Sequence, residues 1–268
     1  MPEGWNSNID RVKMEKIIFA WSGGKDSALC LHKLLESGRY EVACLLTTIN
    51  GHYGRVSMHG VRESLLDLQA ESLGIPLEKM TVSKQSSNAE YEKKMEAVLL
   101  KYKAFGVEQA VFGDIFLEDL RAWREQNLAR IGMRGLFPLW KIDTRELVEE
   151  FIALGFKSIT CCVNAAFLGK EMVGRVIDRD FVRSLPSGVD PCGENGEFHS
   201  FAFEGPIFRR PIPFKTGAKI FKPIEVELNQ NCPLSQDSAP RPALPGGFWF
   251  CDLLEMSPVI DPKEDLLK

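Results

Sequence analysis

The sequence predicts an α/β protein with a doubly wound parallel sheet and a smaller α/β unit packed against it. From Ile17 onward, short β-branched or apolar runs alternate with longer segments of helical period. A glycine-rich turn follows the first apolar run and leads directly into the first helical segment. The 268 residues are enough for one large domain or for two modest ones that share an interface.

The first half of the chain contains four predicted strands, each followed by a helix. We expect strands at residues 16–21, 41–49, 78–82 and 109–115, and helices at about 27–36, 61–73, 88–105 and 118–131. Gly38 and Gly74 stand where the first two helices should end, and Ser87 or Asn88 can cap the third. The fourth strand is apolar in character, which is typical of a strand covered on both faces of a parallel sheet.

The second half is less regular. We expect a helix capped by Thr144, a buried strand at 158–163, a helix around 171–185 and alternating strand character over 201–228. Prolines between residues 233 and 245 predict a linker, which leads to an apolar segment at 248–254. The chain therefore divides into a first α/β unit at 14–130, a second at 131–228, and a proline-rich linker with an apolar C-terminal tail at 229–268.

Composition excludes several classes of protein. The 33 Lys and Arg against 37 Asp and Glu give a formal net charge of -4, so general nucleic-acid binding is not expected. No apolar run approaches the ~20 residues that span a bilayer, and the N-terminus lacks the apolar region of a signal peptide. The seven cysteines are odd in number and have no C-x-x-C spacing, which argues against a disulfide framework or a zinc site. We expect a cytoplasmic protein without membrane association, and self-association is compatible with the sequence.

The strongest chemical signal is the run Ser22-Gly23-Gly24-Lys25-Asp26-Ser27 between the first strand and the first helix. Consecutive glycines before a helix leave backbone N–H groups pointing outward, and the helix N-terminus adds positive potential, so the turn can hold phosphate oxygens. Lys25 adds a positive charge, and Ser22 and Ser27 add hydroxyl donors. The Asp26 carboxylate would repel a phosphate, so it is better explained as a magnesium ligand or a helix-start group. The spacing matches neither G-x-x-x-x-G-K-[ST] nor G-x-G-x-x-G.

Other candidates lie at the carboxyl ends of the predicted strands, where ligands bind in open α/β sheets. Gly113 and Asp114 end the fourth strand, and Asp114 is either a magnesium or substrate group or the N-cap of the next helix. Thr47 lies near the end of the second strand, where it either reads an adenine edge or is an ordinary strand-end residue. His59 in the following loop can bind a phosphate oxygen, although a lone histidine is usually not catalytic.

Two carboxylates and a guanidinium complete the candidate site. Glu194 and Glu197 lie in a glycine-rich loop, where they can bind magnesium, hold ammonium or take a proton from an attacking amine. The alternative is a pair of solvated loop residues. Arg121 is either a clamp for a substrate carboxylate or the partner of Glu125 one helical turn away. Trp140 is either a core residue or a wall of the substrate site.

Ser-Gly-Gly-x-Asp-Ser after a first strand resembles the PP-loop of the N-type ATP pyrophosphatases. Further motifs narrow the resemblance to the diphthine-ammonia ligase family, and these are Phe112-Gly113-Asp114-Ile115 with Arg121 and Glu125, Pro138-Leu139-Trp140, Leu168-Gly169-Lys170, and Cys192-Gly193-Glu194-Asn195-Gly196-Glu197-Phe198. The likeness extends from about residue 16 to about residue 210. Compared with eukaryotic members, Asn195 replaces a glycine, His199 replaces a carboxylate, and Asp119-Leu120 replaces Tyr-Gln. These differences resemble a bacterial subgroup of the family.

The resemblance implies a HUP-like fold of the adenine nucleotide alpha hydrolase type, with a PP-loop ATP-binding domain followed by a substrate-binding domain. It implies an ATP-dependent ligase that adenylates a substrate carboxylate, releases pyrophosphate and transfers ammonia, with ATP and Mg²⁺ as cofactors. The catalytic residues would be Lys25, Asp114, Arg121, Glu194 and Glu197, the nucleotide would contact residues 22–27, Thr47, His59 and Gly113, and Asp26 would bind the metal. The implied acceptor is the diphthine of elongation factor 2. Bacteria do not make diphthamide, so the residues leave the acceptor open.

Two other functions fit parts of the sequence. A PP-loop tRNA-modifying or thiolating enzyme would need paired reactive cysteines and a basic tract, but Cys161-Cys162 is the only close pair and the chain is acidic. A non-catalytic sensor that holds ATP or AMP without turnover would not need the carboxylates of Glu194 and Glu197.

Overall fold

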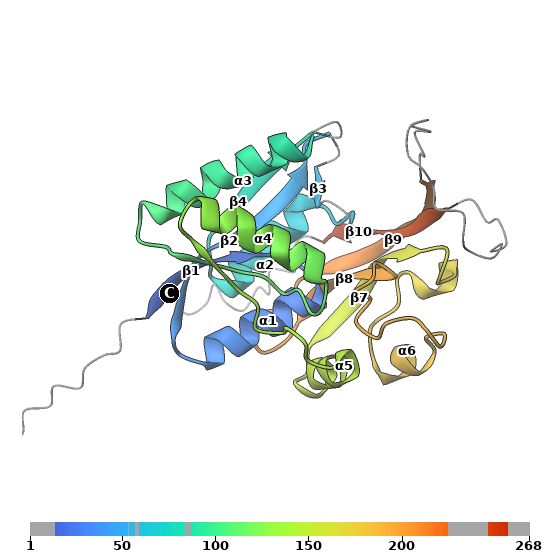
Figure 1. Cartoon of the computed structure of the whole chain (residues 1–268). Coiled ribbons are helices and arrows are strands. Elements are labelled where there is room, and N and C mark those ends of the chain that lie inside the picture. Colours follow the sequence, from blue (N-terminus) through green and yellow to red (C-terminus); the bar gives the residue numbers. More distant parts are fainter. Residues whose placement is uncertain (1–13, 53, 57–58, 84–86, 225–245, 257–268) are drawn as a thin grey trace, which may run out of the picture.

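The computed structural model describes residues 14–52, 54–56, 59–83, 87–224 and 246–256, and these form two sheets with helices around them (Figure 1). The strands of the first sheet are β1 (Glu15–Ala20), β2 (Tyr40–Asn50), β3 (Arg55–Val56), β4 (Leu77–Val82), β5 (Gln109–Val111) and β6 (Arg134–Leu136). The helices between them are α1 (Lys25–Glu36), α2 (Glu63–Leu73), α3 (Asn88–Lys103) and α4 (Glu118–Arg130).

The strand order makes the first sheet doubly wound. The parallel strands lie side by side in the order β4, β2, β1, β5, β6, and the short β3 pairs antiparallel with the end of β2. The chain runs outward from β1 to β2 and β4 and then crosses to β5 and β6. The direction of winding therefore reverses between β1 and β5, and ligands bind at the carboxyl ends of the strands at such a point. The predicted fold class is confirmed.

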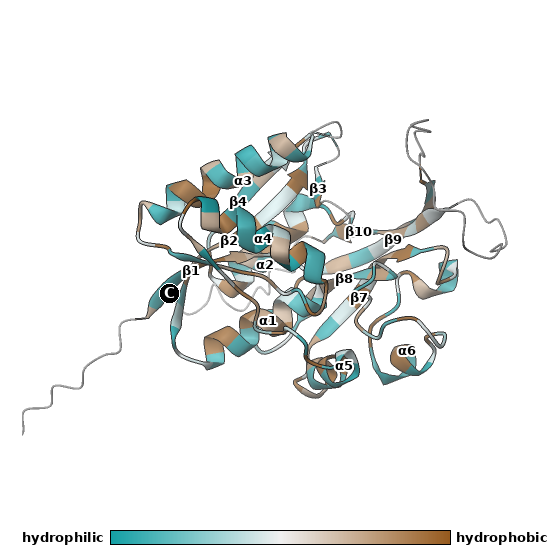
Figure 2. Ribbon diagram, viewed as in Figure 1, coloured by the Kyte–Doolittle hydropathy of each residue, from teal (hydrophilic) through white to brown (hydrophobic). Residues whose placement is uncertain are grey.

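Successive residues of the central strands face different helices. Ile17 and Phe19 of β1 belong to the hydrophobic core that includes α1 and α2, whereas Ile18 belongs to the core that includes α3 and α4. Side chains alternate across a strand, so a strand covered on both faces has to be apolar at consecutive positions. In α4 the buried residue is Leu128, and Figure 2 shows this helix as largely hydrophilic.

The second sheet is antiparallel, with the strand order β8, β7, β10, β9. Its strands are β7 (Lys157–Asn164), β8 (Phe198–Glu204), β9 (Phe214–Pro223) and β10 (Gly247–Glu255), accompanied by α5 (Thr144–Ala153), the short 3-10 helix η1 (Lys170–Met172) and α6 (Arg179–Arg183). Buried residues of this sheet, such as Phe201 and Leu253, belong to the same core as α1 and α2. The two sheets therefore share one hydrophobic core, which fixes the second sheet against α1.

Three sequence-based expectations were wrong in detail. The single helix expected around 171–185 is η1 and α6 with extended chain between them. Gly174 in that stretch has a φ of 76°, and its N–H donates to the Thr160 carbonyl of β7 at 2.8 Å. The segment therefore pairs with the part of β7 that β10 does not reach, instead of continuing as a helix. Asp143, not Thr144, caps α5, because its carboxylate accepts the N–H groups of Arg145 and Glu146. β5 ends at Val111 instead of continuing to Ile115.

The apolar segment at 248–254 is a strand, not a tail. β10 lies between β7 and β9, and its residues Cys251 and Leu253 are buried. The proline-rich residues 229–245 lie outside the described part of the chain. Among the described helices, none combines the length and apolar character that crossing a membrane requires.

Candidate functional site

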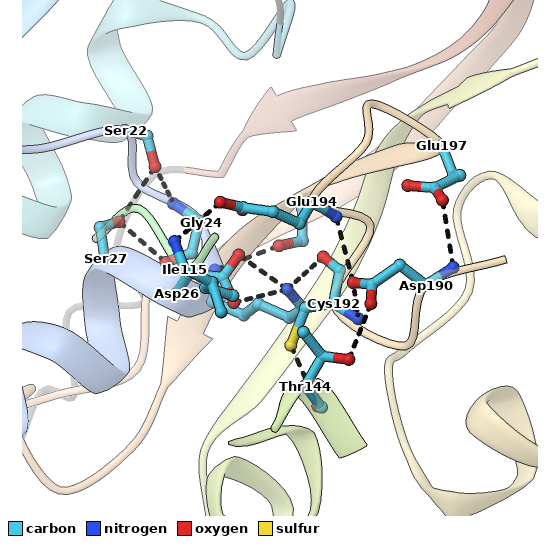
Figure 3. Close-up of polar contacts among 12 residues, drawn as sticks. Ser22, Gly24, Asp26, Ser27, Ile115, Thr144, Asp190, Cys192, Glu194 and Glu197 are labelled. Carbon is cyan, nitrogen blue, oxygen red and sulfur yellow. Dashed lines mark hydrogen bonds and ion pairs between the residues drawn. The ribbon is translucent and has the colours of Figure 1, made fainter. Parts of the chain in front are cut away.

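The Ser-Gly-Gly turn lies at the carboxyl end of β1, at the point where the winding reverses. Gly23 has a φ of 77°, and a Cβ at this position would lie 2.6 Å from the Leu66 side chain, so the turn requires glycine. The Ser22 hydroxyl accepts the Gly24 N–H at 3.2 Å and lies 3.0 Å from the Ser27 hydroxyl (Figure 3). Gly24 is the N-cap of α1 and supplies no side-chain acceptor, so the helix start is without a side-chain cap of its own.

Buried Lys25 and partly exposed Asp26 form an ion pair at the start of α1. Nζ of Lys25 donates to both Asp26 carboxylate oxygens, at 2.6 and 2.7 Å, and to the carbonyl oxygen of Cys192. Burial acts to lower the pKa of the Lys25 ammonium, but the Asp26 carboxylate raises it above its usual value. Lys25 is therefore a cation that ties the first turn of α1 to the loop containing Cys192, and Asp26 already has one cationic partner.

The carboxyl end of β5 approaches the same turn. A Cβ on Gly113 would lie 3.4 Å from backbone atoms of Asp26 and Ser27, which is an ordinary van der Waals distance, so Gly113 lies directly against the start of α1. Asp114 accepts hydrogen bonds from Arg124 of α4 at 2.7 and 3.2 Å. The N-cap of α4 is Leu117, so the capping role considered for Asp114 does not apply.

The glycine-rich loop of residues 190–197 places its two glutamates in different environments (Figure 3). Glu194 reaches toward the first sheet, where its Oε1 accepts the Ile115 N–H at 2.7 Å. Burial raises the pKa of Glu194 to about 7, while the hydrogen bond from Ile115 opposes this shift. Glu197 is 1% exposed, and it accepts the N–H groups of Asp190 at 3.1 Å and Asn195 at 3.0 Å. Neither glutamate is a solvated loop residue.

Two buried polar atoms beside the turn have no hydrogen-bond partner among the residues that the structure describes. These are Thr47 Oγ1 on β2 and His199 Nε2 on β8. His59 lies between β8 and the turn, with its Nδ1 3.3 Å from the Ser200 carbonyl oxygen and its ring centroid 4.6 Å from that of His199. Burial lowers the pKa of His59 to about 4 and that of His199 to about 3, so both imidazoles are neutral at pH 7. Unpartnered polar atoms of this kind fit a polar ligand such as ATP.

Arg121 of α4 contacts Trp140, which lies in the loop that follows β6, the neighbour of β5 in the sheet. The Arg121 guanidinium lies 4.7 Å from the ring centroid of Phe137 and 4.6 Å from that of Trp140, and it pairs with Glu125 at 2.9 Å. The Lys141 N–H donates to the Ile115 carbonyl at 2.7 Å, so the loop containing Trp140 is bonded to the residue that also binds Glu194. Asp114, Arg121 and Glu194 thus lie around the ends of β5 and β6, close to the Ser-Gly-Gly turn that follows β1. Of the other predicted residues, Thr47 lies on β2 and His59 in the loop after β3.

Sequence reasoning missed several residues that shape the site. Gln69 of α2 is 0% exposed and bonds to Trp21, Gly23 and Ala202, and the Ser200 hydroxyl accepts the Lys25 N–H at 3.1 Å. Arg124 holds Asp114. A polar residue within an amphipathic helix has no local signal that separates it from a solvated one, so these contacts become visible only in three dimensions.

A parallel sheet with this strand order and a Ser-Gly-Gly turn at its switch point defines an α/β nucleotide-binding protein of the PP-loop class. Comparison with known proteins specifies the family. Residues 15–135 match the diphthamide synthase N-terminal domain and residues 143–226 match the diphthamide synthase C-terminal domain. The chain belongs to the diphthamide synthase family, as the motifs predicted.

Curated relatives carry the same name across vertebrates. A diphthine-ammonia ligase of Danio rerio is 27% identical over 221 residues, covering 74% of this chain and 85% of the relative. The diphthine-ammonia ligases of Bos taurus and Homo sapiens are 27% and 26% identical, each covering 71% of this chain and 79% of the relative. The two family models cover the strands β1 to β5 and β7 to β9, and they end before β10.

Proposed function

We propose that this protein is an ATP-dependent amide-forming ligase, which adenylates a carboxylate of its acceptor, releases pyrophosphate and transfers ammonia to the acyl group. The observation that supports the proposal is that the PP-loop turn lies next to the loop that contains Glu194. The pKa of Glu194 is about 7, and both segments lie at the point of the first sheet where the winding reverses. The relatives named as ligases agree with this class of enzyme.

In the adenylation step, residues 14–130 hold ATP and residues 131–228 contribute to the acceptor site. Ser22, Ser27 and the turn N–H groups bind phosphate oxygens, Thr47 and His59 contact the nucleotide, and Arg121 holds the acceptor carboxylate. A carboxylate oxygen attacks the α-phosphorus, the bond from that phosphorus to the bridging oxygen breaks, and pyrophosphate leaves with the electron pair. Asp114, positioned by Arg124, faces the same edge of the sheet.

Magnesium would neutralise charge on the phosphates. Among the described residues, no group of three His, Cys, Asp or Glu side chains is placed to hold a metal ion. Mg²⁺ is commonly held by one or two carboxylates together with substrate phosphates, so Asp26 is the proposed protein ligand. Its partner Lys25 then stays beside the phosphates as a balancing positive charge.

In the second step, ammonia attacks the acyl carbon and AMP leaves. Ammonium is not a nucleophile until it loses a proton, and the attacking nitrogen loses another when the amide forms. A carboxylate with a pKa near 7 can take such a proton at neutral pH, so Glu194 is the proposed base. Glu197 has a positioning role, because its carboxylate bonds to backbone groups of its own loop.

The proposed substrates are those in the names of the relatives, diphthine and ammonia. Elongation factor 2 is the proposed bearer of the diphthine, as the family resemblance implies. A cytoplasmic location belongs to the proposal, since the six described cysteines are free thiols. A thiolating enzyme is not favoured, because burial raises the pKa values of both Cys161 and Cys162.

The proposal is tested by phosphorus NMR with magnesium ATP, ¹⁵N-ammonium and diphthine-bearing elongation factor 2. We expect AMP and pyrophosphate in amounts equal to the ¹⁵N incorporated into the acceptor. ADP with inorganic phosphate would contradict attack at the α-phosphorus. ATP that binds but stays intact with this acceptor and with fractionated cell extract would favour the sensor alternative.

A further inference from the structure

The C-terminal strand β10 lies beyond the residues matched by the family models, yet it contacts the nucleotide-binding unit. Asp252 of β10 accepts a hydrogen bond from Arg55 at 2.9 Å and two from Arg62 at 3.1 and 2.8 Å. Arg55 belongs to β3, and Arg62 is the N-cap of α2. The Asp252 carboxylate therefore joins the element that precedes His59 in the sequence, β3, to the element that follows it, α2.

A short chain of contacts leads from Asp252 to the PP-loop turn. Arg55 also donates to the Gly60 carbonyl at 2.6 Å, and a Cβ on Gly60 would lie 2.8 Å from the Phe250 ring of β10. The preceding residue, His59, has its Cε1 3.3 Å from the position of a Cβ on Gly24. β10 thus supports the backbone at Gly60 through an aromatic ring and a guanidinium, and His59 beside it lies against the turn.

The charges make Asp252 the centre of this arrangement. Hydrogen bonds from Arg62 and Arg55 lower the pKa of Asp252, so the carboxylate stays ionised at neutral pH. Its side chain is 19% exposed, so solvent screens the pairs only in part. Without the carboxylate, two guanidinium groups would remain close together and repel each other.

We propose that Asp252 is a positioning residue for nucleotide binding, which holds Arg55 and Arg62 so that Gly60 and His59 stay in place against the PP-loop turn. The inference rests on the proposed function, since it takes ATP as the ligand of that turn. It assigns to the C-terminal strand a role in the first half of the reaction, although the strand belongs to the second sheet.

The test compares Asp252→Asn, Asp252→Glu and the control Glu255→Gln, which removes an exposed carboxylate from the same strand. Calorimetry with magnesium ATP measures the dissociation constant, and AMP formation gives KM for ATP and kcat. We expect Asp252→Asn to raise the dissociation constant and KM about tenfold with a smaller change in kcat, as expected for the loss of charge-assisted hydrogen bonds. Asp252→Glu should restore part of the affinity, and Glu255→Gln should bind ATP like the unchanged chain.

Proton NMR of the imidazole Hε1 atoms of the four histidines measures the local effect of the substitution. We expect Asp252→Asn to shift the His59 signal and to leave that of His32 in place. Unchanged ATP affinity in Asp252→Asn, or a lower melting temperature without any loss of affinity, would overturn the inference alone. Failure of the unchanged chain to bind ATP would overturn the proposed function and this inference together.

Discussion

Protonation of the Glu194 carboxyl affects both the stability of the fold and the proposed role of this residue as a base. The pKa of Glu194 in the folded protein is about 7 because the carboxyl is buried, against an ordinary value of 4.5 for a glutamate in water. The folded state therefore holds this proton more tightly than the unfolded state does. The resulting stabilisation is fully present below about pH 4.5 and is lost as the pH rises through about 7, whereas the proton-accepting form of the side chain is populated only above about 7.

Replacing Glu194 by Gln should separate these two effects. With free ammonia held constant across the pH range, we expect the unchanged enzyme to gain amide-forming activity as the pH rises through about 7. Glu194→Gln should lack this rise and lose about 10²-fold or more in kcat at pH 8. Urea unfolding should show the variant gaining stability relative to the unchanged chain more at pH 8 than at pH 4.5. A variant with the same pH profile as the unchanged enzyme would remove Glu194 from the role of base.

Lys25 gives a second prediction at the scale of one side chain. Lys25→Met keeps most of the buried volume but removes the charge beside the phosphates, so we expect AMP formation to fall by about a hundredfold or more. The Asp26 carboxylate also loses its partner, which should lower stability. Lys33→Met is the control, since Lys33 lies on the same helix and pairs with Glu150. Equal turnover in both variants would contradict the PP-loop assignment.

The sequence predicted that the loop with Glu194 and Glu197 belongs to the site, but it could not predict which role each carboxylate has. The two glutamates are three positions apart in one glycine-rich motif, and the local sequence does not distinguish their roles. The difference arises because the loop closes on Glu197, whose carboxylate bonds to backbone N–H groups, while Glu194 is left to reach Ile115 in another unit. Likewise, a charged Lys25 was predictable, but its bond to the Cys192 carbonyl depends on how the second sheet packs.

At the scale of elements, the turn between β1 and α1 depends on glycine for two separate reasons. Gly23 has a positive φ, and its α-carbon faces Leu66 and Gln69 of α2 at close range. Gly38, which follows α1, also has a positive φ, but within the described part of the chain no residue beyond its direct neighbours comes within 4 Å of the place where a Cβ would be. The two glycines therefore share the backbone requirement and differ in packing.

Comparing Gly23→Ala with Gly38→Ala should separate the effect of the positive φ from the effect of packing against α2. Both place an alanine at a positive φ, which strains the folded backbone by about 1 kcal/mol. We expect Gly23→Ala to lose a further ~1–3 kcal/mol from overpacking and to bind ATP at least tenfold more weakly, because Leu66 and Gln69 must move. Chemical unfolding and ATP calorimetry measure the two quantities. Equal losses of stability with unchanged ATP affinity would show that packing beneath the turn is unimportant.

Regular elements of the first sheet were predictable from local pattern, whereas two features of the second were not. β1, α1, β2 and β4 appear within a few residues of their expected positions, because buried parallel strands and glycine-ended helices leave clear local signals. β10 was missed because its pairing partners, β7 and β9, are defined only after the fold closes. The helix expected around 171–185 was wrong because Gly174 and its neighbours bond to Thr160 of β7.

At the scale of the whole molecule, the two sheets meet directly at the nucleotide turn. The Ala202 N–H of β8 donates to the Gly23 carbonyl at 2.8 Å, and the Gln69 amide donates to the Gly23 carbonyl at 3.0 Å and to the Ala202 carbonyl at 2.6 Å. Gln69 also accepts the Trp21 indole N–H at 2.9 Å. One buried side chain of α2 therefore joins the first sheet, the PP-loop turn and the second sheet.

Gln69→Leu tests whether this connection makes the molecule a single cooperative unit. The substitution keeps a similar volume but leaves the Trp21 indole N–H and the Ala202 carbonyl without this partner, so we expect a loss of about 2–4 kcal/mol in urea unfolding. ATP affinity should fall as well, because the carbonyl of Gly23 loses one of its two bonds and the turn is less firmly held. Gln126→Leu on the exposed side of α4 is the matched control and should change stability by less than about 0.5 kcal/mol. If Gln69→Leu unfolds like the control and binds ATP like the unchanged chain, the shared hydrophobic core alone would hold the sheets together, and the turn would not depend on the second sheet for its shape.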